Sequence, residues 1–163
     1  YTLLQSDLDT NGGGDGRIEN TATVSSNETG VLQDTEAASL IYKAQVDLTK
    51  YVSVDQGSTW QDANIPTGPT LLATAGYNPL FKYTALNNGS VTLKDVILTD
   101  SAYDLNGIDA GTTKNLGDLA PGQLAEFIFE APFTAGQNSG DAVVTATALT
   151  PVMDIDNAYY LGV

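Results

Sequence analysis

Apolar and polar residues alternate with a period of two along several short segments, and this pattern restricts the chain to β-structure. In residues 46–54 the even positions are mostly apolar and the odd positions mostly polar, which is typical of a half-buried strand. Residues 80–86 alternate in the same way through Phe81, Tyr83 and Ala85. Similar runs recur at intervals of about ten residues, separated by Gly, Asn, Asp and Pro. The sequence therefore predicts an all-β, antiparallel β-sandwich and contains no convincing helix.

Turn residues and apolar parity predict how these strands connect. Residues 87–89 (Asn-Asn-Gly) accept positive φ, so they predict a tight hairpin between strand 80–86 and a strand that starts at Val91. The apolar parity shifts between Leu93 and Val96, which predicts a β-bulge. The last strands are predicted at residues 143–149 and 157–161.

The end of the chain repeats a segment near its start. Residues 18–24 (Ile-Glu-Asn-Thr-Ala-Thr-Val) are echoed by residues 142–148, and the acidic run at 34–37 is echoed at 154–158. A chain that repeats its closing strands but not its opening strands is typical of a piece of a tandem array. The two expected parts are residues 1–43, as closing strands of a preceding repeat or a strand-donating connector, and residues 44–163, as a complete module.

The first of these parts is too small to form a sandwich alone. An isolated pair of strands is marginally stable in water, so residues 1–43 need a partner. They could pack on the following module, or they could add to the sheet edge of another chain, where backbone hydrogen bonds supply the affinity. The second possibility would make the module a fibre subunit.

Composition narrows the possible functions. The chain of 163 residues has 20 Asp and Glu against 6 Lys and Arg, and a net charge of −14. Nucleic acids and anionic membranes are therefore poor partners. Without His or Cys, the chain lacks Ser-His-Asp and Cys-His catalysis, the usual zinc sites and disulfides. No apolar run approaches the roughly 20 residues that span a bilayer. We expect no enzyme and no membrane insertion.

Four motifs lie at residues 83–100, residues 116–122, residues 54–60, and residues 1–9 together with 18–24. Together they resemble the bacterial cell-surface conserved repeats, a family of tandem immunoglobulin-like (Ig-like) modules. The resemblance implies an Ig-like sandwich at the cell surface or in the extracellular space. It also implies a structural role in an adhesin stalk, surface layer or filament, with neighbouring repeats or copies of the same chain as partners. The resemblance implies no catalysis.

The strongest candidate site is an Asp- and Gly-rich segment at residues 7–19. Asp7, Asp9 and Asn11 alternate and are followed by Gly, which resembles the first half of an EF-hand loop. Calcium prefers six to eight oxygen ligands on a flexible backbone, and this segment offers carboxylate and amide oxygens. Ile18 stands where the usual bidentate Glu would be. The alternative is a solvated turn without a metal.

A second acidic cluster lies near the end of the chain. Asp154 and Asp156 project from one side of an extended segment and could chelate calcium together, or they could form a charged turn. The candidate calcium ligands are Asp7, Asp9, Asn11, Asp15, Asp154 and Asp156. A third set is interpreted as a solvated loop, and its members are Asp100, Asp104, Asn106 and Asp109.

Trp60 leaves open a second class of function. It follows Gly57, Ser58 and Thr59 in a less regular segment, and the chain has eight tyrosines. Aromatic rings on an exposed face could form a platform for sugar rings, which would make the chain a carbohydrate-binding module. The alternative is that these rings belong to the core or to a sheet face.

Overall fold

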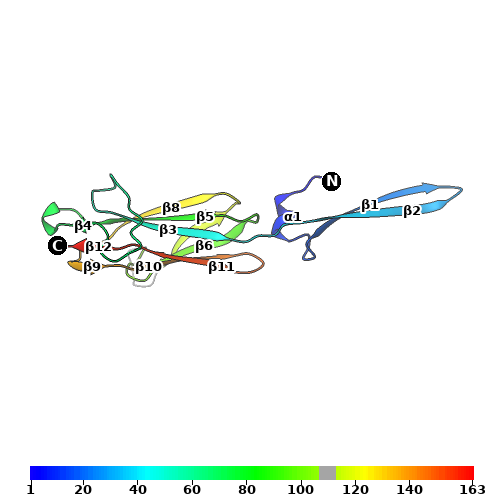
Figure 1. The fold of residues 1–163 in the computed structure, drawn as a ribbon. Coiled ribbons are helices and arrows are strands. Elements are labelled where there is room, and N and C mark those ends of the chain that lie inside the picture. The colour runs from blue at the N-terminus through cyan, green and yellow to red at the C-terminus, as the bar shows by residue number, and fades with distance from the viewer. Residues whose placement is uncertain (107–112) are drawn as a thin grey trace.

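Two antiparallel sheets face each other in the computed structural model, which describes residues 1–106 and 113–163. The first sheet has the order β3-β5-β8 and the second has the order β11-β10-β6-β7 (Figure 1). The strands of the first sheet are β3 (Val46–Ser53), β5 (Leu80–Asn87) and β8 (Leu124–Glu130). Those of the second are β6 (Leu93–Asp100), β7 (Lys114–Leu119), β10 (Asp141–Thr147) and β11 (Val152–Asn157). The predicted all-β, antiparallel sandwich is confirmed.

The alternating residues build the core between these sheets. Phe81, Tyr83 and Ala85 of β5 are all buried, as the period of two predicts. They meet apolar side chains of the opposite sheet, which also alternate along their strands. The buried residues of that sheet include Val96, Leu98, Ala142, Val144 and Ala146.

A smaller sheet lies at the end of the sandwich that holds the C-terminus (Figure 1). It has the order β4-β12-β9, with strands β4 (Thr70–Leu71), β12 (Tyr160–Gly162) and β9 (Gly136–Asn138). A short 3₁₀ helix, η1 (Ala73–Ala75), follows β4. No helix in the described parts of the chain is long and apolar enough to cross a membrane.

The N-terminal residues form a separate hairpin at the other end of the sandwich. Strands β1 (Arg17–Ser26) and β2 (Gly30–Ser39) pair only with each other among the described residues. Every residue of this hairpin is exposed except Ile18, which is half-buried. Figure 1 shows the hairpin projecting away from the sandwich, on the side opposite the C-terminus. We call β1–β2 the projecting hairpin and β10–β11 the closing hairpin.

One predicted connection is wrong. Strands β5 and β6 do not form a hairpin, because β5 pairs with β3 and β8 whereas β6 pairs with β10 and β7. The reason is Asn87, whose buried side chain donates hydrogen bonds of 2.8 Å to the carbonyl oxygens of Val91 and Leu119. These bonds hold the chain as it crosses from one sheet to the other. The predicted bulge is confirmed, since the β6–β7 register shifts between Leu93 and Val96.

Two acidic segments lie in regular secondary structure. A five-residue helix, α1 (Gln5–Asp9), occupies the start of the Asp- and Gly-rich segment, where the sequence predicts no helix. The carboxylate of Asp7, in the first turn of this helix, accepts a hydrogen bond from the backbone N–H of Leu4, the residue that precedes the helix. The second acidic cluster lies inside strand β11, which agrees with the extended segment and not with the charged turn.

Candidate functional site

Two carboxylates of the closing hairpin accept hydrogen bonds from an edge strand of the opposite sheet. Asp154 Oδ2 accepts the backbone N–H of Leu48 at 2.8 Å, and Asp156 Oδ2 accepts that of Lys50 at 2.7 Å. Both N–H groups belong to β3, which is an edge strand of the first sheet. Unpaired N–H groups on a sheet edge invite pairing with other chains, so these aspartates protect the edge. Burial raises the pKa of Asp156, although the hydrogen bond from Lys50 opposes this shift.

The projecting hairpin can be aligned with the closing hairpin by matching its acidic strand, Asp34 and Glu36, to Asp154 and Asp156. In the closing hairpin, Val144 pairs with Asp154. In the projecting hairpin, Ala22 pairs with Asp34. A second acidic residue follows two positions later in both hairpins, Glu36 after Asp34 and Asp156 after Asp154. The matching pairs are Asn20–Glu36 with Ala142–Asp156, Ala22–Asp34 with Val144–Asp154, and Val24–Leu32 with Ala146–Val152. In this alignment the first strand is shifted by two residues from the sequence repeat, which matches residues 18–24 with residues 142–148. A shift of two keeps the same side chains on the same face of the hairpin.

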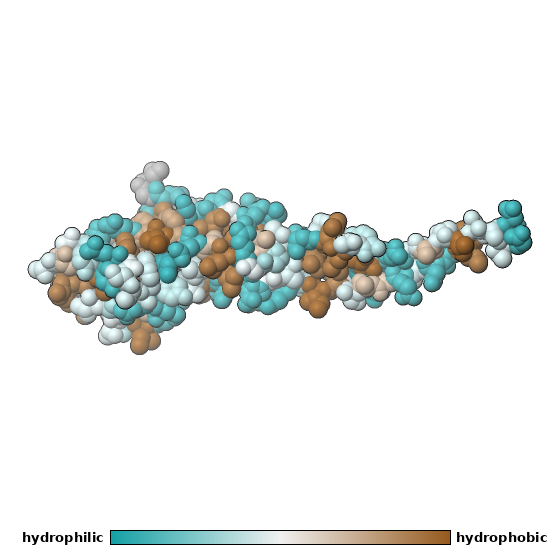
Figure 2. Space-filling model, turned by 90° about the horizontal axis from the view of Figure 1, so that it is seen from above, coloured by the Kyte–Doolittle hydropathy of each residue, from teal (hydrophilic) through white to brown (hydrophobic). Residues whose placement is uncertain are grey.

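The two hairpins differ in what covers them. Val144 is 0% exposed because it lies in the core of the sandwich. On the matching face of the projecting hairpin, Val24 is 64% exposed and Leu32 is 55% exposed. Figure 2 shows hydrophobic side chains gathered near the tip of this hairpin and again at its base. The face that is interior in one copy is thus uncovered in the other.

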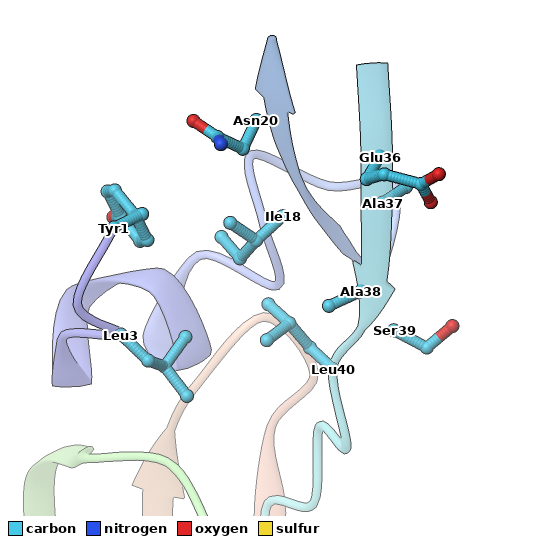
Figure 3. Close-up of a pocket in the computed structure, with 9 residues that line it drawn as sticks. All are labelled: Tyr1, Leu3, Ile18, Asn20, Glu36, Ala37, Ala38, Ser39 and Leu40. Carbon is cyan, nitrogen blue, oxygen red and sulfur yellow. The ribbon is translucent and has the colours of Figure 1, made fainter. Parts of the chain in front are cut away.

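The base of the projecting hairpin is hollowed. A cavity of about 450 Å³ lies beside it, open on one side and lined mostly by apolar surface. Figure 3 shows Tyr1, Leu3, Ile18 and Leu40 around this hollow. A second, smaller hollow of about 190 Å³ lies farther along the same hairpin and includes Val24. The uncovered apolar surface therefore continues from the base of the hairpin toward its tip.

Direct hydrogen bonds fix the projecting hairpin to the sandwich. Ser90 and Lys43 exchange two of them, because the Ser90 N–H donates to the Lys43 carbonyl at 2.8 Å and the Lys43 N–H donates to Ser90 Oγ at 2.9 Å. Asp9 Oδ1 accepts the Thr92 N–H at 2.7 Å. A side chain at Gly89 would collide with the carbonyl oxygen of Lys43, so the close approach requires glycine. We call α1, residues 40–45 and residues 88–92 the junction.

The predicted calcium ligands near the N-terminus are held by internal donors. Asp7 Oδ2 accepts Tyr1 Oη–H at 2.6 Å, and this bond is the main cause of the lowered pKa of Asp7. Burial disfavours ionisation of Asp9, but hydrogen bonds from Gln5 and Thr92 outweigh it and lower the pKa of Asp9.

The other predicted ligands make local contacts. Asp15 Oδ1 accepts the Arg17 N–H at 3.0 Å within its own turn. Asn11 has a φ of 52°, and its carbonyl oxygen accepts the N–H groups of Gly14 and Gly16. Across residues 1–106 and 113–163, no three acidic side chains gather as a metal site would require. Asp109 of the third acidic set lies outside the described residues. Calcium binding stays a prediction from the sequence.

Trp60 is half-buried and close to a cation. The Lys82 ammonium lies 4.7 Å from the centroid of the Trp60 ring and 5.0 Å from that of Tyr51. A sugar that stacked on this side of Trp60 would have to displace the lysine. Carbohydrate binding stays a prediction, and loss of glycan binding in Trp60→Ala would support it.

The sequence interpretation missed a buried polar cluster inside the sandwich. Lys50 and Asp100 form an ion pair of 2.6 Å, and both side chains are 0% exposed. Tyr83 Oη–H donates to the same carboxylate at 2.9 Å. The interpretation of Asp100 as solvated is therefore wrong. Lys50 carried a signal that could have found the cluster, because it occupies a core-facing position between Leu48 and Val52.

Comparison with known proteins adds no family to this description. No protein-family model and no curated protein matches the chain.

Proposed function

We propose that the chain is an extracellular structural module of a bacterial surface protein or filament. In this proposal the projecting hairpin joins it to a neighbouring module by completing that module's sandwich. The carrying observation is that both hairpins place acidic and apolar side chains on one face when their acidic strands are aligned, and that this face is covered in one hairpin and uncovered in the other. The motifs that resemble cell-surface repeats support the extracellular assignment, and the proposal assigns no catalytic role.

The closing hairpin indicates what the projecting hairpin would contact. In the sandwich, β10 pairs with β6, and β11 places its carboxylates against the edge of β3. By the same geometry, β1 would pair with a β6-type strand of the neighbour. Asp34 and Glu36 would then accept N–H groups from the edge of a β3-type strand. The partner is thus a sandwich of the same kind that lacks its own closing hairpin.

The position of the hairpin suits end-to-end assembly. It projects from one end of the sandwich, and the C-terminus lies at the other end (Figure 1). The junction ties the hairpin to the sandwich through Asp9, Lys43 and Ser90. A neighbour that received the hairpin would therefore be held in line with this module. Such an arrangement fits a stalk or filament that transmits force along its length.

A graft within the full chain tests the proposal. Residues 142–156 are replaced by residues 20–36, which places Ala22, Val24 and Asp34 at the positions of Val144, Ala146 and Asp154. We expect the grafted chain to unfold cooperatively, and amide exchange to show protected N–H groups at Leu48 and Lys50. The matched control, the slipped graft, uses residues 21–35. It keeps the hairpin's own pairing of Thr21 with Thr35, but a slip of one residue turns the opposite face of the hairpin toward the core.

The two grafts give a clear decision. If the first graft folds and the slipped graft does not, the projecting hairpin has the shape and polarity of a closing hairpin. If the first graft is no more stable than the slipped one, the uncovered face is not built to enter a sandwich. The proposal would then be overturned.

A further inference from the structure

The interior of the sandwich holds an amine and a carboxyl group in contact. Lys50 Nζ of β3 lies 2.6 Å from Asp100 Oδ2 of β6, and both side chains are fully buried. The two strands belong to opposite sheets. Aromatic rings of Phe81, Tyr83 and Tyr103 surround the ammonium, with centroids 4.8, 5.6 and 5.5 Å from Nζ. This pair is the one fully buried ion pair among the described residues.

The environment favours the reactive form of the lysine. Burial lowers the pKa of Lys50, although the charge of Asp100 and its hydrogen bond oppose this shift. A lysine that loses its proton in an apolar site becomes a nucleophile. Transfer of one proton from the ammonium to the carboxylate leaves an amine beside a carboxylic acid, and no net charge then has to be buried.

We propose that Lys50 and Asp100 react to form an intramolecular amide bond between Nζ and Cγ, which covalently links the two sheets. The inference does not depend on the proposed function of the projecting hairpin. It adds a modification site inside the sandwich, and it requires no further reactant.

The reaction balances within the pair. The lone pair of the neutral amine attacks Cγ and forms the C–N bond. One carboxyl oxygen then leaves as water, and it carries the hydroxyl proton together with one proton from the amine. The other oxygen becomes the amide carbonyl, and the nitrogen keeps one hydrogen. Because the two groups are already held in contact, the reaction avoids the entropy cost of bringing them together.

Neighbouring groups support both the reaction and its product. Tyr83 Oη–H donates to Asp100 Oδ2 at 2.9 Å, and the Ala102 N–H donates to Oδ1 at 2.9 Å. These donors polarise the carboxyl group and stabilise the negative charge that develops on oxygen. The carbonyl oxygen of Gly140 accepts a hydrogen bond from Lys50 Nζ at 2.6 Å. The amide N–H of the product can donate to the same oxygen, so the buried carbonyl keeps its partner.

Intact mass under denaturing conditions tests the proposal, because denaturation breaks an ion pair and leaves an amide intact. We expect the purified full chain to weigh one water less than its sequence. Proteolysis with trypsin should give a branched peptide that joins residues 44–82 to residues 95–114, since an acylated Lys50 is not cleaved. A chain with the full sequence mass, and with free Lys50 after proteolysis, would overturn the proposal.

Three variants separate the cross-link from other losses of mass. Lys50→Arg should restore the full mass, because its guanidinium does not form the amide. Asp100→Asn should lose one ammonia in place of water, since the amide nitrogen is then the leaving group. Lys94→Arg is the matched control, because Lys94 forms an exposed ion pair of 2.7 Å with Asp118, and this variant should still lose one water. Loss of water that persisted in Lys50→Arg would place the modification elsewhere and overturn the proposal.

Tyr83 acts on the pair as a positioning residue, and its effect is kinetic. Tyr83→Phe should slow the appearance of the dehydrated mass in freshly made protein, while the final product stays the same. A cross-linking rate unchanged by this substitution would contradict the role of the hydroxyl.

Discussion

A single buried amide holds the crossing between the two sheets. Asn87 is fully buried, donates to two carbonyl oxygens and accepts the Gly89 N–H at 3.0 Å. Asn87→Ala would leave these three backbone groups without their partner. Because each unsatisfied buried group costs about 1–3 kcal/mol, we expect a loss of at least about 2 kcal/mol in the free energy of unfolding.

Denaturant unfolding measures this loss, and the adjacent residue supplies the control. Asn88 has the same side chain but is exposed, so Asn88→Ala should change stability by less than about 0.5 kcal/mol. Equal effects of the two substitutions would show that the crossing does not depend on the Asn87 amide.

Asp55 predicts a dependence of stability on pH. Its carboxylate accepts hydrogen bonds from the Thr59 hydroxyl at 2.6 Å, the Thr59 N–H at 2.9 Å and the Ser53 hydroxyl at 2.7 Å. These bonds, led by that from the Thr59 hydroxyl, lower the pKa of Asp55 from 3.8 to about 2. A lowered folded-state pKa means that the stabilisation is present above the ordinary pKa and is lost as the pH falls toward 2.

The variant Asp55→Asn tests this dependence. At neutral pH it should melt at a lower temperature than the native chain, and the difference should shrink as the pH falls from 3.8 to about 2. Asp47→Asn, on the exposed side of β3, is the matched control for removal of one charge. A difference in melting temperature that stays constant with pH would contradict the assignment.

The buried pair of Lys50 and Asp100 could be predicted only in part from the sequence. The alternation in residues 46–54 predicts β3 and its core face, and the structure confirms both. The same pattern places Lys50 on that face, but a pattern of polarity does not say which partner neutralises a buried charge. That partner, Asp100, lies in another sheet and was interpreted as solvated. Its burial follows from tertiary contacts that no local rule describes.

At the scale of elements, the junction decides whether the projecting hairpin has a fixed direction. Asp9 links α1 to the turn of the sandwich through the Thr92 N–H, and Gln5 Nε2 donates to the Ser90 carbonyl at 3.0 Å. Asp9→Ala removes the first of these links. We expect the hairpin to sample a wider range of orientations, while the melting temperature of the sandwich stays nearly unchanged.

Residual dipolar couplings of the hairpin relative to the sandwich measure this change. The control is Asp15→Ala, because Asp15 contacts only its own turn through the Arg17 N–H in the described hydrogen bonds. Couplings in Asp9→Ala that match those of the native chain would show that the other junction contacts suffice.

Elements were predicted well where the chain alternates and poorly where turn chemistry was decisive. The Asn-Asn-Gly segment is a strong local signal for a hairpin. The side chain of Asn87 nevertheless uses its hydrogen bonds to cross between sheets, so the local signal gave the wrong pairing. Asp154 and Asp156 were grouped because they share one face of an extended segment. The two side chains do share one face, but each carboxylate accepts a hydrogen bond from a backbone N–H of the edge strand β3.

At the scale of the whole molecule, one sandwich and one projecting hairpin form an elongated particle (Figures 1 and 2). The repeat in the sequence predicts two parts, residues 1–43 and residues 44–163, and this division stays a prediction. The sequence repeat matches residues 18–24 with residues 142–148, whereas alignment of the acidic strands matches residues 20–26 with residues 142–148, because the turn of the projecting hairpin is longer. The two turns differ by two residues when the matching pairs are aligned.

The net charge of −14 makes the behaviour of the whole particle sensitive to ions. Screening by any salt reduces repulsion among exposed carboxylates, and its range is about 10 Å at 0.1 M ionic strength. A calcium site would add an effect that depends on the identity of the ion. Both described hydrogen bonds to Asp7 end on Oδ2, so coordination through Oδ1 would leave them in place.

The calcium hypothesis therefore predicts a higher melting temperature in calcium chloride than in sodium chloride or magnesium chloride of equal ionic strength. The excess should disappear in a variant that combines Asp7→Asn with Asp15→Asn. A control variant that combines Asp34→Asn with Glu36→Gln in the projecting hairpin should keep the excess melting temperature, since it removes the same charge elsewhere. Equal melting temperatures in the three salts would mean that screening alone stabilises the chain, and that the Asp- and Gly-rich segment serves the junction without a metal.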